Sequence, residues 1–565
     1  MMKKIWMLIS VFLFTAAVFA DDRESIADID SPEPAEKAGD YISAGESDGP
    51  DIRKGEGFDL RPSEVLIKGQ IDTRVMLRRE ITSLEDLQDI KNILYEKEKI
   101  DIPGHYFDER DLAPKTRPAE KDFVGKMKIE GGTFNTLAAE GILGIRFDRK
   151  NNFVMRLLHE NYDRPEVENT GRQISDNKNR GVIYYKTAYG ETEAAYKFGA
   201  TYNGHKNPMP SNVFGGEYFM SDIDFSAGLY GRLFEYDYSF LLKYRYFSQD
   251  GINRGSIYKE NRIRNTITAE RDFLADESKV KLVYFADYFI SAVENRGRGY
   301  DGVFGIDTMV KGIFYFEPFV LHGGLRLQNF NMAENFYRLN PYFYAGWDFA
   351  PWAGVYAEFD PEMNMPSYPD ELASPFVVVN DYYRVPAENA SLKGVFAVKI
   401  NEVYAEAYAG YKSVADGKYV DETSSGSLVF TYYNSSFDFM YYGLNLDIPL
   451  GRDLNFGFSY IYRHIAESEA GNMTYMPNNT LEAELGYDSD KWKAGISVKA
   501  ESGAWGTRTL RLPAYALLNV KISREITDNL NIGGYINNVL NNENYLLYWY
   551  KEKGLNLGLG AEYNF

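Results

Sequence analysis

The sequence has no cysteine and a deficit of basic residues. Without cysteine there can be no disulfide, no thiolate metal site, no cysteine nucleophile and no lipid-modified N-terminal cysteine. Lys and Arg number 62 against 82 Asp and Glu, which gives a formal net charge of -20. We therefore expect no nucleic-acid partner, because the phosphates of nucleic acid require clustered Lys and Arg.

Motifs for catalysis and metal binding are also missing. The sequence has no Gly-x-Ser-x-Gly elbow, and a serine nucleophile needs a histidine oriented by a third group. Histidines are few and isolated, without the spacing of a metal site; they are His105, His159, His205, His322 and His464. We predict that the chain is not an enzyme and uses no metal or cofactor.

The apolar run that stands out lies at the N-terminus. Lys3 and Lys4 precede apolar residues 5–14, and small residues then lead to Ala20. This pattern predicts a secretory signal peptide over residues 1–20 that is cleaved after Ala20. The alternative is an N-terminal membrane helix, but this run and all later ones fall short of the ~20 apolar residues that such a helix needs. The exported chain is then either soluble or a β-barrel.

The beginning of the mature chain is acidic. Residues 21–59 contain thirteen Asp or Glu and four Lys or Arg, a composition that predicts a disordered linker. Residues 60–122 differ, because an alternating stretch is followed by apolar residues at helical spacing, including Leu84 and Leu87. We predict a small α+β segment with a connector, which lies in the periplasm or fills a lumen.

Residues 123–565 have one uniform pattern. Segments of about ten residues alternate in polarity and are separated by turns, which is typical of membrane barrels. In one segment an apolar and aromatic face is opposed by a polar face; the first comprises Tyr236, Tyr238, Phe240, Leu242, Tyr244 and Tyr246, and the second Asp237, Ser239, Lys243 and Arg245. A soluble antiparallel sheet with one face in water also alternates polar and apolar residues. Alternation alone therefore leaves both a soluble sheet and a membrane barrel open.

Loop lengths and aromatic content favour the barrel. Short connections such as 401–402 and 451–453 alternate with long ones such as 163–180, 203–217 and 360–389. Outer-membrane barrels have short periplasmic turns, longer external loops and aromatic girdles, and 15% of this chain is aromatic.

The number of strands depends on residues 427–450. One long strand there gives 22 strands, whereas a break at residues 434–436 gives 23. Both termini should face the periplasm, which requires an even number. The expected fold class is therefore all-β: a transmembrane antiparallel β-barrel of about 22 strands in the outer membrane of a Gram-negative-type bacterium, preceded by the short N-terminal α+β segment.

The C-terminal segment GLNLGLGAEYNF alternates and ends on an aromatic residue. Gly560, Tyr563 and Phe565 resemble the signal that outer-membrane proteins present to the barrel-assembly machinery. The alternative is an ordinary last strand. We expect the assembly machinery and outer-membrane lipid to be partners of the chain.

Residues 512–545 resemble the end of TonB-dependent outer-membrane receptors. A proline-led strand, a short turn and a second strand lead to the corner Asn538-Val539-Leu540, followed by Tyr545 and a Gly-led closing strand. Residues 127–147 resemble the first barrel hairpin of that family. The resemblance implies a 22-stranded barrel that binds a solute and transports it across the outer membrane.

The front of the chain departs from that family. Its barrels are filled by a preceding plug domain, and residues 21–122 show no plug signature. Glu64, Val65, Leu66 and Ile67 form either an energy-coupling box, the start of a truncated plug or an ordinary edge strand. The expected partner is thus an energising inner-membrane complex or a separate plug or periplasmic protein.

The candidate for ligand contact is the loop at residues 360–389, because loops on a rigid scaffold commonly carry binding residues. Its aromatic residues are Tyr368, Phe376, Tyr382 and Tyr383. The alternative is that they pack within the loop or anchor it at the membrane interface. Besides solute transport, the sequence leaves open a scaffold that docks a periplasmic partner and a passive porin-like channel.

Overall fold

The computed structural model describes residues 123–147, 151–163, 175–189, 192–206, 217–233, 235–251, 255–275, 278–295, 300–316, 318–331, 335–350, 352–361, 377–378, 387–400, 403–422, 430–451, 453–469, 471–489, 491–507, 509–547, 550–551 and 554–565. The expected signal peptide, acidic linker and α+β segment lie outside these residues. Within them, no helix has the length and apolar character to cross a membrane.

The described chain is an antiparallel barrel of 22 strands. Its first half comprises β1 (Phe123–Gly132), β2 (Thr136–Arg146), β3 (Asn152–Asp163), β4 (Ser175–Tyr189), β5 (Thr192–Lys206), β6 (Glu217–Leu233), β7 (Tyr236–Gly251), β8 (Gly255–Ala275), β9 (Ser278–Asn295), β10 (Tyr300–Phe316) and β11 (Phe319–Asn331). Its second half comprises β12 (Asn335–Ala350), β13 (Ala353–Phe359), β15 (Ala387–Ile400), β16 (Val403–Glu422), β17 (Phe430–Pro449), β18 (Leu454–Ser468), β19 (Asn479–Asp488), β20 (Trp492–Glu501), β21 (Tyr515–Thr527), β22 (Leu530–Asn537) and β25 (Asn556–Asn564).

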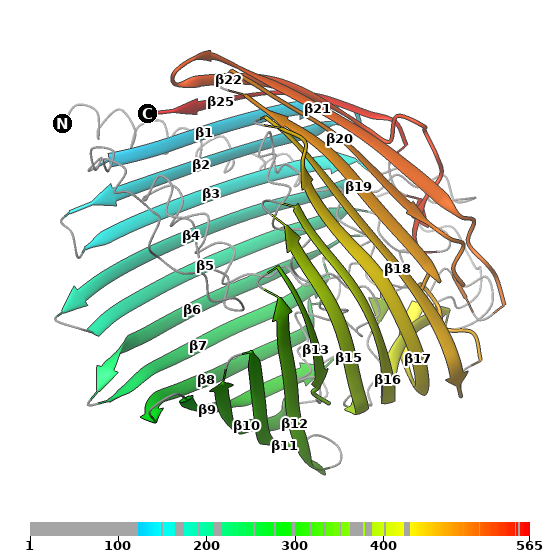
Figure 1. Ribbon diagram of the computed structural model, residues 1–565. Helices are drawn as coiled ribbons and strands as arrows, with labels where there is room; N and C mark the ends of the chain where they lie inside the picture. Colours follow the sequence, from blue (N-terminus) through cyan, green and yellow to red (C-terminus); the bar gives the residue numbers. More distant parts are fainter. Residues whose placement is uncertain are drawn as a thin grey trace. The chain divides into compact units, whose positions relative to one another are not determined.

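The barrel closes where its first and last strands meet. Each strand pairs with the next along the chain, and β25 pairs with β1 from Lys126↔Asn564 to Gly132↔Gly558. Figure 1 shows the blue β1 beside the red β25. Closure leaves no sheet edge exposed in the wall. β17 is one continuous strand of 20 residues, so the even count of 22 is confirmed.

Several strands extend beyond the lengths expected from the sequence. β8 has 21 residues and β16 has 20, whereas a tilted strand needs about 9–11 residues to span a bilayer. β4 already begins at Ser175, inside the loop expected at residues 163–180. Beyond the bilayer both faces of a strand meet water, so the polarity pattern that marks a spanning segment fades while backbone pairing continues.

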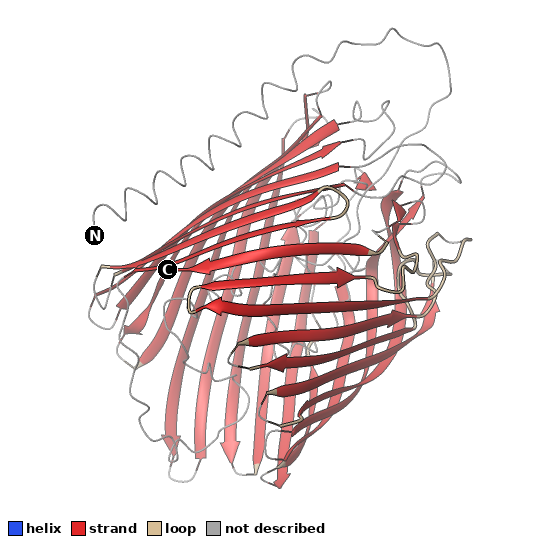
Figure 2. Ribbon diagram, turned by 90° about the horizontal axis from the view of Figure 1, so that it is seen from above, coloured by secondary structure: helices blue, strands red, loops and turns tan. Residues whose placement is uncertain are grey.

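The two faces of the wall differ in chemistry, as the alternation predicts. Large apolar side chains on one face are exposed, for example Leu559 (74%), Ile290 (61%) and Leu325 (57%). The opposite face carries ion pairs, described below. We therefore assign the apolar face to lipid and the polar face to the lumen. Figure 2 shows the strands running obliquely around the wall, with loops at their ends.

An aromatic belt covers the lipid face near the short turns of β10 to β15. Phe319 lies between Phe316 and Trp347, with ring centroids 6.4 and 5.9 Å away. Trp347 contacts Phe349 edge-on at 5.5 Å, and Phe349 stacks on Phe396 at 6.3 Å. Aromatic rings favour the membrane–water interface, so this belt marks the boundary of the bilayer at the end of the barrel with the short turns.

The closing seam depends on a glycine and the C-terminal phenylalanine. The amide nitrogen of Gly125 donates to the carbonyl oxygen of Phe565, and Phe565 donates back to Gly125, both at 2.9 Å. The Phe565 ring lies over Gly125, where a Cβ would overlap it. It also packs 5.7 Å from Phe123 and 6.0 Å from Tyr563. The seam thus accepts the ring because residue 125 has no side chain.

We predict that Gly125→Val weakens closure by about 1–3 kcal/mol, because its side chain must displace the Phe565 ring. Gly131→Val is the matched control: it lies on the same strand and face, and the nearest atom to a Cβ there is 4.0 Å away. The measurement is the folded fraction during urea titration in lipid vesicles, read as the heat-sensitive shift in gel mobility. Equal stability of the two variants would contradict this role of the seam.

Candidate functional site

The lumenal face of the wall is lined by pairs of opposite charge. The pairs join inward-facing residues of the same or neighbouring strands around much of the barrel; they include Lys126–Glu562, Arg156–Glu140, Lys197–Asp224, Arg245–Asp222, Arg262–Glu260, Arg264–Asp287, Arg326–Asp307, Lys412–Glu388 and Lys499–Glu501. Alternation along each strand places these side chains on one face, and antiparallel register brings partners together. The result is a polar surface whose charges largely neutralise one another.

Arg326 makes the most complete of these contacts. Its guanidinium donates from Nε to Oδ1 of Asp307 at 2.9 Å and from Nη2 to Oδ2 at 2.6 Å. Gln328, itself fully buried, donates from Nε2 to the same Oδ2 at 3.1 Å. A bidentate arginine–carboxylate pair fixes orientation as well as charge. Asp307 is thereby held rigidly in the wall.

Two arginines also hold the ends of the long connection between β13 and β15. Arg326 donates from Nη1 to Oδ1 of Asp360, 3.4 Å away, where the connection begins. Arg338 donates from Nη1 to the carbonyl oxygen of Glu388 at 2.7 Å, where it ends. The loop expected to contact ligand is therefore tied to the lumenal wall at both ends.

Lys243 is an inward-facing cation with another cation opposite it. It lies opposite Arg264 in the β7–β8 register, so two positive charges are cross-strand neighbours. The nearby carboxylates are already engaged, since Asp287 binds Arg264 and Asp224 binds Lys197. Among the described residues Lys243 has no carboxylate within ion-pair distance. Like charges placed directly opposite are unfavourable, so this part of the wall favours an added anion.

A second lumenal feature is a group of aromatic rings on β11 to β17. The His322 ring stacks on Tyr344 at 4.4 Å, and Tyr344 stacks on Tyr356 at 5.6 Å. Further along, Tyr408 and Tyr441 lie 6.3 Å apart. Rings with polar tips suit a wall that packs against neighbouring strands and also faces water.

Glycines let two of these rings lie flat against the wall. A Cβ at Gly443 would overlap the Tyr408 ring, and a Cβ at Gly410 would overlap the Tyr441 ring. Tyr408 and Tyr441 are accordingly only 7% and 3% exposed. The two tyrosine rings therefore pack closely against the wall.

The sequence prediction missed this aromatic group. Tyr404, Glu406 and Tyr408 alternate along β16, and the Tyr404 hydroxyl donates to Oε2 of Glu406 at 2.6 Å. The sequence did contain a signal for this group, because tyrosine and glutamate occupy every second position and therefore share the polar face of the strand. It is easily missed, because tyrosine on a barrel strand is equally typical of the lipid face.

Among the predicted site residues, those at the C-terminus are described. Gly560 pairs with Glu130 of β1 and Gly533 of β22, while Tyr563 lies on the lipid face with 48% of its surface exposed. With Phe565 they form the closing seam, and their recognition by the assembly machinery remains a prediction.

The other predicted site residues lie outside the described residues: Ala20, Glu64, Val65, Leu66, Ile67, Tyr368, Phe376, Tyr382 and Tyr383. Within the described part of the ligand loop, β14 (Val377–Val378) pairs in parallel with Phe430–Thr431 of β17. That pairing places one point of the loop against the wall, at the end of β17 that lies opposite the short turns.

The connection between β22 and β25 contains a charged pair outside the bilayer. Lys551 of the short strand β24 (Tyr550–Lys551), which pairs with β23 (Tyr545–Leu547), donates to Oε1 of Glu543 at 2.9 Å. This hydrogen bond and the positive charge lower the pKa of the Glu543 carboxyl. The pair favours the ordered connection near neutral pH and loses that effect as the carboxyl becomes protonated in acid.

Comparison with known proteins identifies the fold. The sequence matches no family model and no curated protein. The siderophore receptor PirA from Acinetobacter baumannii has a TM-score of 0.64 at 9% identity, over 80% of this chain and 81% of that one. A mutant of the ferric enterobactin receptor PfeA from Pseudomonas aeruginosa has a TM-score of 0.62 at 12% identity, over 80% of this chain and 81% of that one. The iron transporter FrpB from Neisseria meningitidis has a TM-score of 0.63 at 12% identity, over 79% of this chain and 82% of that one.

The barrel has the fold of the TonB-dependent receptors. The resemblance expected from the C-terminal sequence is thereby confirmed at the level of fold. Identities of 9–12% carry no residue-level correspondence, so the lumenal chemistry of this TonB-dependent receptor-like barrel rests on its own side chains.

Removing Arg326 should destabilise the barrel strongly. Arg326→Met leaves the Asp307 carboxylate, 7% exposed, without its bidentate partner, and we expect a loss of about 3–5 kcal/mol in the free energy of unfolding. The control is Arg232→Met, whose partner Asp237 is 3.9 Å away and whose side chain is 59% exposed; its loss should be about 0–1 kcal/mol. Urea titration in vesicles measures both. Similar losses would show that the wall pairs are weak.

Proposed function

We propose that the chain is an outer-membrane protein that binds a solute and transports it through the barrel, in the manner of TonB-dependent receptors. The observation that carries the proposal is the closed 22-stranded barrel whose lumenal face is polar and ion-paired while its outer face is apolar. A wall of this kind provides a wet path across a bilayer. Its neighbours are transport receptors by name, which accords with the prediction that the chain is not an enzyme.

Ferric chelates are the first solute class to test, since the neighbours are named as siderophore receptors and an iron transporter. Lys243 supports an anionic solute, because its neighbouring carboxylates already bind other cations. A 22-stranded opening also needs an occluding element. Residues 60–122 or a separate partner supply it in this proposal, and an energising inner-membrane complex drives the transport.

The test is uptake of a labelled ferric chelate by iron-starved cells that carry the full-length chain. We expect uptake to stop when the energising complex is removed. Lys243→Gln should lower uptake severalfold, because the unpaired wall cation is lost. Lys186→Gln is the control, since Lys186 is already paired with Glu193 at 2.6 Å and should leave uptake unchanged. Uptake that persists without the energising complex would indicate a passive channel.

Single-channel conductance distinguishes the remaining alternatives. The full-length protein should be silent, and a variant lacking residues 21–121 should conduct in large steps once its folded state is confirmed by gel mobility. Large steps from both proteins would support a porin-like channel. Silence from both, together with no uptake, would contradict transport and favour a scaffold that docks a periplasmic partner.

A further inference from the structure

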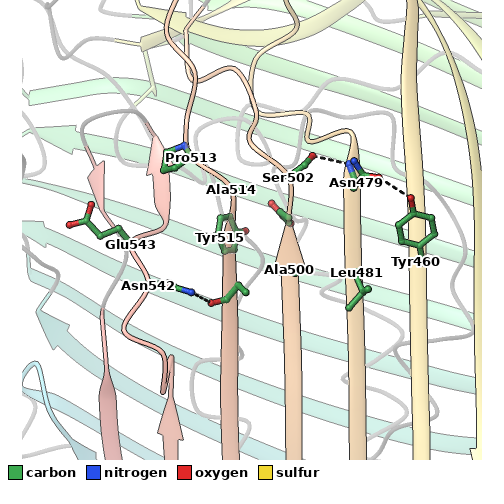
Figure 3. Close-up of a pocket in the computed structure, with 12 residues that line it drawn as sticks. Tyr460, Asn479, Leu481, Ala500, Ser502, Pro513, Ala514, Tyr515, Asn542 and Glu543 are labelled. Atoms are coloured by element: carbon green, nitrogen blue, oxygen red, sulfur yellow. Dashed lines mark hydrogen bonds between the residues drawn. The ribbon is translucent and has the colours of Figure 1, made fainter.

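The rim of the barrel contains a hollow at the ends of β18 to β21 that lie opposite the short turns (Figure 3). Its volume is about 710 Å³, within the range of about 300–1,000 Å³ that is typical of small-molecule sites. Both faces of the wall contribute to its lining. Ala500 and Ala516 are register partners on the face of exposed Ile496, and the next pair, Glu501 and Tyr515, lies on the lumenal face. The hollow therefore lies across the rim, apart from the ion-paired wall of the lumen.

The wall is low at this hollow. β19 and β20 have ten residues each and β22 has eight, whereas β8 has 21. A tilted strand needs ~9–11 residues to span a bilayer, so β19 and β20 end where they leave it. The lining also includes residues of the connections beyond the strands, such as Pro513, Asn542 and Glu543. The hollow is therefore open to the aqueous phase, and its ligand must be a hydrated group.

The charges of the lining favour a neutral ligand. None of the described residues that line the hollow is Lys or Arg, so an anion would meet no cation there. The two lining carboxylates are already paired, since Nζ of Lys499 lies 2.9 Å from Oε1 of Glu501 and Nζ of Lys551 lies 2.9 Å from Oε1 of Glu543. A cationic ligand would have to displace one of these lysines. A ligand without net charge fits this balance.

Side-chain amides supply hydrogen-bonding groups. The Tyr460 hydroxyl donates to Oδ1 of Asn479 at 2.8 Å, and Asn542 donates from Nδ2 to the carbonyl oxygen of Ala516 at 2.6 Å (Figure 3). Each contact uses one half of an amide. Within the described part of the chain, Nδ2 of Asn479 has no acceptor and Oδ1 of Asn542 has no donor. A hydroxyl group both donates and accepts, so a ligand rich in hydroxyls can satisfy both.

The floor between these amides is apolar. Tyr460, Leu481, Ala500 and Ala516 are successive cross-strand neighbours on β18, β19, β20 and β21. The row falls from two large side chains to two alanines, which leaves room above the alanines. A sugar ring has C–H groups on its faces and hydroxyls around its edge. It therefore suits a floor of an aromatic ring and small apolar side chains with amides beside it.

We propose that this hollow binds a neutral hexose oligosaccharide, with sugar faces against Tyr460 and the alanines and with hydroxyls at Asn479 and Asn542. The oligosaccharide is either a free solute or the sugar headgroup of a glycolipid in the surrounding membrane, because both reach the rim of the barrel. The site goes beyond the transport proposal. Binding there requires neither an occluding element nor an energising complex, so it would persist if that proposal failed.

The experiment is a saturation-transfer NMR titration of the full-length protein in lauryldimethylamine oxide, a detergent without a sugar headgroup. The neutral probes are maltotriose, cellotriose and the delipidated outer-core oligosaccharide of lipopolysaccharide. We expect at least one of them to bind. Binding of a trisaccharide identifies a free solute, and binding of the core oligosaccharide alone identifies a glycolipid headgroup. Trigalacturonate, a trisaccharide with three carboxylates, should not bind, because no lining cation would meet it.

Ala500→Phe places a ring on the floor and should raise the Kd of the bound probe about tenfold or more, because the ring occupies the space of the sugar. Ala494→Phe is the matched control: it adds the same ring to the same face of β20, nearer the short turn, and should bind as the wild type does. Ala516→Phe tests the floor a second time should Ala500→Phe fail to fold, as judged by heat-sensitive gel mobility.

Weaker binding in a folded floor variant, with unchanged binding in the control, supports the site. A wild-type protein that binds none of the neutral probes would overturn the proposal. Equal binding by the wild type and a folded floor variant, or equal binding of trigalacturonate and a neutral trisaccharide, would overturn it as well.

Discussion

Closure of the sheet is the constraint on which the rest of the structure depends. Hydrocarbon offers no partner to a backbone amide or carbonyl, so a strand can cross a bilayer only when both of its edges are paired. Here the last strand, β25, forms backbone hydrogen bonds with the free edge of the first strand, β1. The final residue, Phe565, both donates a hydrogen bond to Gly125 and accepts one from it. Even the terminal side chain takes part, since the Phe565 ring covers that glycine.

Closure also divides the side chains into two chemically distinct sets. Inward positions meet water, and they carry ion pairs together with tyrosines that lie flat over glycines of the neighbouring strand. Outward positions meet lipid, and they carry exposed apolar side chains such as Leu559 and Ile290. The charged lumenal wall and the apolar outer surface are thus two consequences of one closed sheet.

Much of the fold could be predicted from the sequence, because period-two alternation is imposed by the two solvents. The outward face of Tyr236 and Tyr244 follows from that pattern. The continuity of β17 followed instead from the even number of strands that is required when both termini lie on one side of the membrane. The strand ends could not be predicted, because strands such as β8 continue beyond the bilayer. There both faces of the strand meet water, so polar and apolar residues no longer need to alternate. At the site, the sequence revealed that the wall would be polar. It did not reveal that Arg326 and Arg338 hold the two ends of one loop, because those contacts join strands that only the three-dimensional register brings together.

Closure is tested most directly by a disulfide across the seam, which the absence of native cysteine makes unambiguous. Ile129 and Ala561 are register partners in β1 and β25, and antiparallel partners of this kind have Cα atoms about 5.5 Å apart, within the range of a disulfide. The double variant Ile129→Cys with Ala561→Cys should crosslink on oxidation and alter mobility in a denaturing gel. Ile129→Cys with Leu557→Cys, on the same face but four residues out of register, should not. Crosslinking in neither pair, or equally in both, would contradict the closed barrel with this register.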